Sequence, residues 1–346
     1  MSGGMDGWPY DVVGSTINDR YRMERLLGTG GMGAVFAATH LAMGRSVAIK
    51  LITPELREHP KAIKRFQQEA RAVAAANRRG VVDVIDYDID QVHGHFLVME
   101  LLEGESLEDR LNRLRRLSPM EALSINIEIL ETLDLVHRQG VVHRDLKPAN
   151  IFLARNDEGE ERVKVLDFGI SRVATADFKT KLTTPGVPVG TPRYMAPEQA
   201  QCDPNVDHRA DLYSVGALLY ESLSGTKPYA DAPAGQILAE VLLRPVRSFR
   251  EVAPHLSPRL HDLVERAMTR EREGRFQSAA RMRQELIELQ ARLSMSTPSR
   301  TLVNDDDFAP TLDSEEWAAD GGRGAESSDA YRGLESQSTV RQETSS

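Results

Sequence analysis

A glycine-rich stretch between two strand-like segments is the first feature that indicates chemistry. Residues 28–35 read Gly-Thr-Gly-Gly-Met-Gly-Ala-Val, which matches the pattern G-x-G-x-x-G-x-V. Glycines let a backbone come close to phosphate groups without side chains intervening. A purely structural hairpin and a dinucleotide-binding turn fit the glycines alone equally well. The dinucleotide turn needs a helix directly after the glycines, and residues 35–38 continue as a strand, which disfavours it.

A lysine and a glutamate on neighbouring elements provide a second chemical signal. Lys50 ends the apolar pattern Val-Ala-Ile-Lys, and Glu69 lies on a helix predicted for residues 61–76, facing the same direction as its apolar stripe. A lysine in an apolar strand is usually a surface residue with a buried stem. If it pairs with Glu69, its ammonium is held where it can clamp two phosphates.

The strongest signal is a pair of short polar segments. Residues 141–153 read Val-Val-His-Arg-Asp-Leu-Lys-Pro-Ala-Asn-Ile-Phe-Leu, and after the strand-like residues 163–166 the chain reads Asp-Phe-Gly. Polar groups alternate with apolar anchors in one loop. A solvated charged turn explains the charges, but it explains neither the flanking hydrophobic residues nor the second acid–aromatic–glycine turn.

The elements that must position these groups fall into two parts. Alternating patterns predict strands in the first part, over residues 21–38 (around the glycine turn), 45–51, 81–88 and 95–100. In the second part, Ser118 as N-cap and Pro119 as first helical residue begin a helix that runs to about residue 138. Helical periodicity also covers residues 211–224, 234–243, 258–268 and 278–293. A small strand-rich part therefore precedes a larger helical part.

Composition limits the classes of protein that fit. The 346 residues are 40% hydrophobic, enough to bury a sizeable core. The single cysteine, Cys202, excludes a disulfide framework and a thiolate cluster and fits a reducing compartment. Apolar runs are too short to span a bilayer, and residues 1–10 lack a secretory pattern. We therefore expect a cytoplasmic protein without a membrane span.

The charge is unevenly distributed along the chain. The net charge is −9, and residues 297–346 carry 11 acidic and 4 basic side chains, which leaves −2 for the first 296 residues. That balance argues against a general nucleic-acid surface. Beyond about residue 294 the chain is too poor in large apolar residues to fold alone, so we expect residues 294–346 to be an acidic, disordered tail.

Taken in order, the motifs resemble those of a bacterial eukaryotic-like (Hanks-type) serine/threonine protein kinase. They are the glycine pattern, Val-Ala-Ile-Lys, the helical Glu69, His-Arg-Asp, Asp-Phe-Gly and, at residues 196–198, Ala-Pro-Glu. The resemblance covers residues 20–293 and implies an α+β, two-lobed protein kinase fold. It has a small β-rich N-lobe (about 20–101) with one key helix and a larger, mainly α-helical C-lobe (about 102–293). A flexible segment, residues 1–19, precedes it.

The resemblance also implies a division of roles. Lys50 holds the α- and β-phosphates of ATP and is oriented by Glu69. Asp145 orients the substrate hydroxyl and accepts its proton, while Lys147 neutralises charge on the γ-phosphate. This division suits phosphoryl transfer, which needs positioning and charge neutralisation more than covalent help. The implied ligands of Mg²⁺, for which Mn²⁺ can substitute, are Asn150 and Asp167.

Further residues are implied in nucleotide binding. The backbone of the glycine stretch covers the phosphates, through Gly28, Thr29, Gly30, Gly31, Met32 and Gly33. Adenine needs an apolar slot with backbone hydrogen bonds, and the implied walls, gatekeeper and linker are Leu27, Val35, Ala48, Leu153, Met99, Glu100, Leu101 and Leu102. Taken alone, each of these residues is more often part of a core than of a ligand site.

Two features resemble serine/threonine rather than tyrosine specificity. Lys147 lies two residues past Asp145, where tyrosine kinases carry A-A-R or R-A-A. Thr191 resembles the threonine whose hydroxyl braces both the catalytic base and that lysine. The resemblance therefore implies transfer to the hydroxyl groups of serine and threonine in proteins.

Arg144 indicates regulation, because in the family such an arginine pairs with a phosphate on the activation loop, here residues 167–198. By their distance from Gly190, Thr183 and Thr184 are the predicted autophosphorylation sites. A phosphate adds about two negative charges and can order the loop against Arg144. Solvent-facing threonines are the alternative.

Three other residues resemble structural parts of the family. Glu198 and Arg275 resemble a buried ion pair that fixes the activation loop, and Asp211 resembles the acid that pins the catalytic loop. The chain departs from the family at residues 155–162, which lengthen a turn and resemble a surface insertion. It also departs in its acidic tail, since bacterial relatives often carry a transmembrane helix and a sensor there.

Other function classes fit less well. A nucleotide-binding pseudokinase scaffold typically lacks one or more catalytic residues, and all are present here. A small-molecule phosphotransferase does not need the Ala-Pro-Glu segment and the helices beyond it, which shape a groove for protein substrates. We therefore expect protein substrates and no nucleic acid. A kinase-domain dimer stays open, as does a phosphothreonine-reading partner for Thr301 and Thr311 in the tail.

Overall fold

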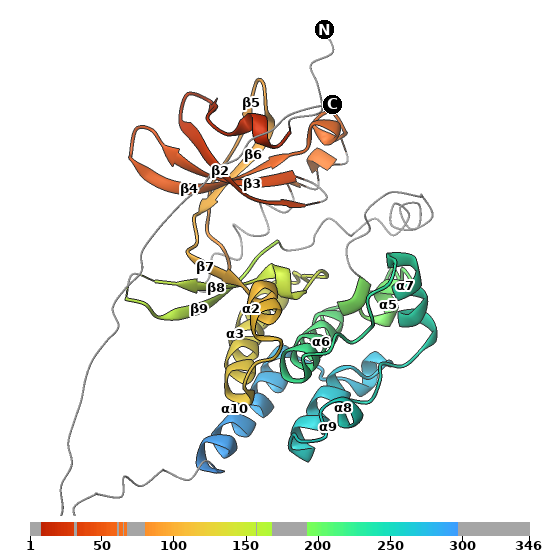
Figure 1. Ribbon diagram of the computed structural model, residues 1–346. Coiled ribbons are helices and arrows are strands. Elements are labelled where there is room, and N and C mark those ends of the chain that lie inside the picture. The colour runs from red at the N-terminus through yellow and green to blue at the C-terminus, as the bar shows by residue number, and fades with distance from the viewer. Residues whose placement is uncertain are drawn as a thin grey trace, which may run out of the picture. The chain divides into compact units, whose positions relative to one another are not determined.

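Strands dominate the chain as far as Glu100, and helices dominate it from Leu107 onward (Figure 1). The computed structural model describes residues 8–30, 33–60, 62–64, 66–67, 80–156, 158–167 and 192–296. The strands are β1 (Thr16–Ile17), β2 (Tyr21–Gly30), β3 (Gly33–His40), β4 (Arg45–Ile52), β5 (Val84–Asp90), β6 (Gly94–Glu100), β7 (Gly104–Ser106), β8 (Ile151–Arg155) and β9 (Glu161–Val165).

The first six strands form one antiparallel sheet in the order β1-β2-β3-β4-β6-β5. Strand β4 lies inside the sheet, and its last six residues are all buried. This explains its unbroken apolar sequence, because a strand covered on both faces does not alternate. Lys50 is the exception within that buried run, so its ammonium requires a polar partner.

The N-terminal segment differs from the expectation of a flexible stretch over residues 1–19. From Trp8 onward it is described, with a 3-10 turn at Tyr10–Val12 and strand β1, which pairs with β2. Val12 and Ile17 are almost fully buried in a cluster on this sheet, against which Trp8 packs. Sparse apolar residues among glycines therefore suffice to anchor the segment, because the sheet offers them an apolar surface.

The helical part is organised around one buried helix. Its helices are α2 (Leu107–Leu114), α3 (Pro119–His137), α5 (Pro197–Ala200), α6 (Arg209–Ser224), α7 (Ala234–Leu243), α8 (Phe249–Val252), α9 (Pro258–Ala267) and α10 (Ala279–Ser296). Every residue of α6 from Ala210 to Leu223 is buried. A helix that is enclosed on all sides forms the centre of its domain, so α6 is the rigid element against which the site is built.

The predicted helix start at Ser118 is confirmed. The Ser118 side chain accepts a hydrogen bond from the amide of Glu121, and Pro119 is the first helical residue of α3. A cap of this kind stabilises a helix by about 1 kcal/mol. It fixes the start of the helix that leads directly into the polar loop at residues 143–150.

A second, three-stranded sheet in the order β7-β8-β9 lies beside the polar loop. The lengthened turn predicted at residues 155–162 forms the closed end of the β8–β9 hairpin, where Arg155 pairs with Glu161. Glu161 in turn makes two hydrogen bonds, of 2.8 and 2.6 Å, to the buried guanidinium of Arg110 on α2. The extra residues are therefore tied to the helical part.

Candidate active site

One buried carboxylate, that of Asp211, holds the loop at residues 143–150. Asp211, near the start of α6, has no exposed surface. Its Oδ2 accepts hydrogen bonds from the amide of His143 and from Nε2 of His137, both at 2.8 Å, and its Oδ1 accepts one from the amide of Arg144, also at 2.8 Å. The prediction that Asp211 pins this loop is confirmed.

These hydrogen bonds also settle the charge state of Asp211. Burial by itself raises the pKa of this carboxyl, but the hydrogen bond and charge of His137, the charge of His143 and the amide of Arg144 outweigh it. The net effect is a pKa below the ordinary value of 3.8. An ionised Asp211 therefore holds the backbone of Arg144, whose φ of +66° is in the left-handed region that non-glycine residues rarely adopt.

Two polar side chains of the loop converge on a third, the carboxylate of Asp145. The ammonium of Lys147 lies 3.1 Å from Oδ2 of Asp145. Nδ2 of Asn150 donates to the backbone oxygen of Asp145 at 2.7 Å and to its Oδ2 at 3.3 Å. The loop thus presents a carboxylate whose orientation is fixed by its own neighbours, about three-quarters shielded from water.

Lys50, a fourth polar group of the site, comes from the six-stranded sheet. The ammonium of Lys50 on β4 lies 2.7 Å from Oδ1 of Asp167, which follows β9. The Lys50 side chain is 10% exposed and that of Asp167 is 52% exposed, so the pair opens to water on the carboxylate side. Asp167 also has a left-handed φ of +50°, a strained conformation of the kind found at functional sites.

Asp167 and the loop are fixed relative to each other by short contacts. Nε2 of His143 donates to the carbonyl of Leu166 at 2.9 Å, and the amide of Leu166 donates to the carbonyl of Asn150 at 2.8 Å. Both contacts involve the residue directly before Asp167. The structure therefore brings Lys50, Asp145, Asn150 and Asp167 into one connected site.

The donor set suits a small divalent cation. Asn150 and Asp167 offer an amide oxygen and a carboxylate, and hard oxygen ligands of this kind are what Mg²⁺ and Mn²⁺ prefer. Mg²⁺ in phosphate-handling sites takes one or two protein ligands and completes its shell with substrate phosphate and water. Two oxygen donors beside Lys50 fit that pattern.

Most of the residues implied in adenine binding belong to one apolar cluster or pack against it. Ala48 and Met99 face each other on β4 and β6, and Leu153 on β8 belongs to the same buried cluster. Val35 and Leu102 pack on this cluster, while Leu27 is 40% exposed.

The amide and the carboxylate of Glu100 already have partners within the protein. Its amide donates to the carbonyl of Asp83 at 3.0 Å, and its carboxylate contacts the amide of Asp83 and the ammonium of Lys164. The amide of Glu100 is therefore already bonded within the protein.

The glycines of the hairpin differ in why glycine is needed at each position. A Cβ on Gly33 would lie 1.9 Å from the carbonyl oxygen of Leu51, so close strand packing alone requires glycine there. A Cβ on Gly28 would meet nothing within 4 Å, and on Gly30 it would meet only the oxygen of Gly33, at 3.9 Å. Packing against the described residues therefore does not explain these two glycines.

The predicted ion pair between Glu198 and Arg275 is confirmed and is fully buried. Arg275 donates to both carboxylate oxygens at 2.7 and 2.8 Å. Its remaining donors reach the carbonyls of Thr269, Arg209 and Arg270, so all five N–H groups of the guanidinium are used. This pair anchors α5 to the segment before α10.

Two contributors escaped the sequence analysis. His137 supplies the third hydrogen bond to Asp211, and Gln199 on α5 donates to the carbonyl of Arg144 at 2.9 Å. Neither residue lies in a recognisable motif, since each acts on a residue more than 50 positions away. The predicted site residues Gly31, Met32, Glu69, Thr183, Thr184 and Thr191 lie outside the described residues.

Comparison with known proteins agrees with this geometry. The family model described as "Protein kinase domain" matches residues 21–287. The chain belongs to the protein kinase family. The predicted kinase fold, with its β-rich N-lobe and helical C-lobe, is confirmed: the solved kinase domain of PknI from Mycobacterium tuberculosis superimposes with a TM-score of 0.62 at 25% identity, covering 80% of this chain and 98% of that one.

Several curated relatives are bacterial serine/threonine kinases. The probable serine/threonine-protein kinase SCO3848 of Streptomyces coelicolor is 38% identical over 271 residues, which are 77% of this chain and 39% of that protein. Pkn1 of Myxococcus xanthus is also 38% identical, over 77% of this kinase and 38% of its own length. PknA of M. tuberculosis is 35% identical over 84% and 65%. The chain thus spans between about two-fifths and two-thirds of the length of these relatives. None of its described helices is long and apolar enough to cross a membrane.

Proposed function

We propose that this chain is a serine/threonine protein kinase that transfers the γ-phosphoryl group of Mg-ATP to hydroxyl groups of proteins. The observation that carries the proposal is the 2.7 Å contact between Lys50 and Asp167, next to a loop on which Asp145, Lys147 and Asn150 converge. A phosphate-binding cation, a metal-binding carboxylate and a proton acceptor are the parts that phosphoryl transfer requires.

In this proposal the residues of the chain position the reacting groups and neutralise their charge. Lys50 holds the α- and β-phosphates, and Asn150 with Asp167 holds Mg²⁺, which neutralises charge on the β- and γ-phosphates when it is bound. Asp145 accepts the proton of the attacking hydroxyl as the hydroxyl oxygen forms the new bond to the γ-phosphorus, while the bond from that phosphorus to the β-phosphate oxygen breaks and ADP leaves. Lys147, 3.1 Å from Asp145, neutralises charge on the transferred group.

The apolar surface of Ala48, Met99 and Leu153 receives adenine in this proposal. The ring enters with its edge toward the backbone of Glu100 and Leu102, which offers the carbonyl of the first and the amide of the second. Burial of an aromatic ring against these side chains supplies binding energy without addressing the reacting phosphate, so this surface sets affinity rather than rate.

Regulation by phosphate is part of the same proposal. Arg144 donates to the carbonyl of Val206 at 3.3 Å, while its buried Nε has no hydrogen-bond partner among the described residues. A guanidinium in this condition fits a phosphate on Thr183 or Thr184. A kinase-domain dimer is also part of the proposal. A cytoplasmic location and a phosphothreonine-reading partner for the tail belong to this proposal as well.

The proposed activity is tested with purified full-length protein, Mg²⁺ and radiolabelled ATP. We expect incorporation of label on serine and threonine, and a fall of about 10²–10⁴-fold for Asp145→Asn, which removes a general base. Mass spectrometry then locates the phosphates. Binding of ATP without any transfer to the protein or to a model substrate would favour a pseudokinase scaffold instead.

A further inference from the structure

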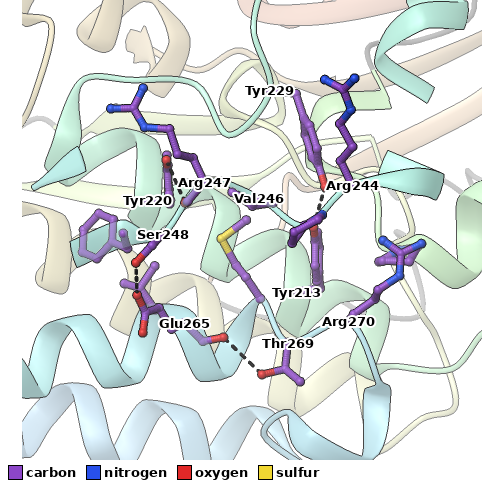
Figure 2. Close-up of a pocket in the computed structure, with 15 residues that line it drawn as sticks. Tyr213, Tyr220, Tyr229, Arg244, Val246, Arg247, Ser248, Glu265, Thr269 and Arg270 are labelled. Carbon is purple, nitrogen blue, oxygen red and sulfur yellow. Dashed lines mark hydrogen bonds between the residues drawn. The ribbon is translucent and has the colours of Figure 1, made fainter. Parts of the chain in front are cut away.

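A cavity of about 410 Å³ lies in the helical part and shares no lining residue with the site described above (Figure 2). Its walls come from α6, from α9 and from the connection between α7 and α8. The proposed phosphoryl transfer uses none of its lining residues. A volume of this order holds one large side chain or a small ligand.

The cavity wall is apolar and aromatic, with its hydroxyl groups already bonded. Tyr213 and Tyr229 share a hydrogen bond between their hydroxyl groups at 3.4 Å, and the hydroxyl of Tyr220 donates to the carbonyl of Arg247 at 3.2 Å. Val246 and Met268 also line the cavity. An occupant therefore meets mainly ring faces and aliphatic carbon, which favours an apolar or aromatic group.

Three arginines line this cavity, and they are not equivalent. Arg270 is engaged, since it donates to the carbonyls of Val241 and Leu242 at the C-terminal end of α7. Arg244 and Arg247 are exposed, and their guanidinium groups make no hydrogen bond or ion pair with any residue that the structure describes. In Figure 2 both project to the same side of the lining residues, opposite Thr269.

The acidic residue on the wall does not neutralise these two arginines. Glu265 accepts hydrogen bonds from Ser248 at 2.8 Å and from Arg250 at 3.3 Å. Burial raises the pKa of Tyr220, and the positive charge of Arg247 acts against that rise, which places this charge beside the aromatic wall. The cavity thus combines an apolar interior with two exposed arginines that make no ion pair with the described residues.

The cavity is separated from the catalytic loop by a single short helix. Pro197 lines the cavity, and Gln199 of the same helix, α5, donates to the carbonyl of Arg144, next to Asp145. Residues two apart point to opposite sides of a helix. Because a helix with its side chains is about 10 Å wide, a segment docked in the cavity lies close to the proposed site of transfer.

We propose that this cavity docks an acidic segment of a protein substrate. An apolar side chain of the segment enters the cavity, and carboxylates of the segment bind Arg244 and Arg247. The proposal rests on the proposed kinase function. Guanidinium groups bind carboxylates with paired hydrogen bonds, and a docked segment raises the effective concentration of the phosphoacceptor nearby. Two arginines are too few for a nucleic-acid footprint, which typically neutralises about 6–10 phosphates.

Binding of a short fluorescent peptide with one tryptophan among glutamates tests the site directly, by anisotropy with the full-length protein. We expect R244E/R247E to weaken binding about tenfold or more, as the loss of two exposed charge pairs implies. The single variants R244E and R247E are each compared with the control R259E, which makes the charge change of one such substitution at an exposed position of α9 outside the cavity. Replacing the tryptophan of the peptide by serine should also weaken binding.

Several outcomes would overturn the docking site. One is a peptide affinity that R244E, R247E and R259E change equally; another is an affinity that does not depend on the tryptophan. A single-stranded oligonucleotide that binds more tightly than the peptide through the same arginines would assign the cavity to nucleic acid. Circular dichroism of R244E/R247E checks that the fold is retained, which we expect because both residues are exposed.

A kinetic experiment connects docking to transfer. The acidic segment is joined by a glycine–serine linker to a threonine-containing substrate peptide. We expect the joined peptide to have a lower KM than the same peptide without the segment, with kcat unchanged. R244E/R247E should remove that gain and leave the peptide without the segment unaffected, whereas a gain that survives in the variant contradicts the proposal. If the peptide binds through the arginines but no phosphate is transferred, the proposed activity is wrong and the docking site stands.

Discussion

Two ion pairs of this kinase have similar lengths and opposite surroundings. The pair of Glu198 and Arg275 is buried, with side chains 9% and 0% exposed, and every donor of the arginine is used. In the pair of Lys50 and Asp167, the carboxylate is 52% exposed. Contact distance alone, 2.7 Å in both, does not distinguish them.

Burial is what separates their roles. A buried, saturated pair has no alternative partners, so breaking it leaves a charge in an apolar interior. A pair that is open on one side can exchange a contact for water, a cation or a phosphate at little cost. The first pair is therefore suited to hold structure and the second to exchange partners during binding.

The largest expected effect comes from breaking the buried pair. Arg275→Met leaves Glu198 buried without a partner, and we expect the free energy of unfolding to fall by about 3–5 kcal/mol. Urea denaturation followed by circular dichroism measures it. Arg162→Met is the matched control, because its pair with Glu160 is exposed on both sides and should contribute less than about 1 kcal/mol. Equal stability of the two variants would remove the distinction drawn above.

Breaking the open pair should affect activity instead. Lys50→Met keeps an apolar stem in β4 and leaves Asp167 solvated, so we expect stability to change by less than about 1 kcal/mol. The rate of phosphate incorporation should fall about 10²–10³-fold, as for loss of one charge-stabilising donor. Steady-state kinetics with the unfolding curve checks both quantities. A variant that unfolds early but transfers phosphate normally would reverse the roles of the two pairs.

Asp211 offers an intermediate case, a buried carboxylate that binds amides rather than a guanidinium. Asp211→Asn keeps one accepting oxygen and leaves a donor among His137, His143 and Arg144 without a partner. We expect a loss of about 1–3 kcal/mol in unfolding free energy. A fall in kcat should accompany it, because the backbone before Asp145 is no longer held. Unchanged kcat together with reduced stability would show that the loop keeps its conformation without this carboxylate.

The smallest expected effect is a pH dependence of that same group. Because the pKa of Asp211 is below its ordinary value in the folded protein, the unfolded chain takes up the proton first as pH falls. The stability from Asp211 is therefore complete above about pH 4 and is lost as pH falls through the lowered pKa. The difference in unfolding free energy between wild type and Asp211→Asn should be constant from pH 7 to about pH 5 and shrink in stronger acid. A difference that grows in acid would contradict the lowered pKa.

Much of the fold could be predicted because its signals are local. The cap at Ser118, the apolar run before Lys50 and the periodicity of residues 234–243 each define an element within a few residues. The site motifs could be found for the same reason, since Asp145, Lys147 and Asn150 fall within six positions.

What the sequence did not reveal depends on long-range packing. The hydrogen bonds of His137 and Gln199 join segments that only the tertiary fold brings together. The anchoring of the N-terminal segment was missed because glycines suggested flexibility, while the burial of Ile17 depends on a sheet built from later residues. The cavity between α6 and α9 likewise has no sequence motif, because its lining comes from scattered positions.

The junction between the two lobes of this kinase is very short. Strand β6 ends at Glu100 and β7 begins at Gly104, where a Cβ would lie 2.0 Å from the carbonyl oxygen of Leu153. Three residues thus form the covalent pivot for any opening or closing motion. Leu102, the proposed adenine contact, is the middle one, so a nucleotide bound there touches the pivot itself. Binding of a nucleotide in the proposed adenine slot is then mechanically coupled to the angle between the two lobes.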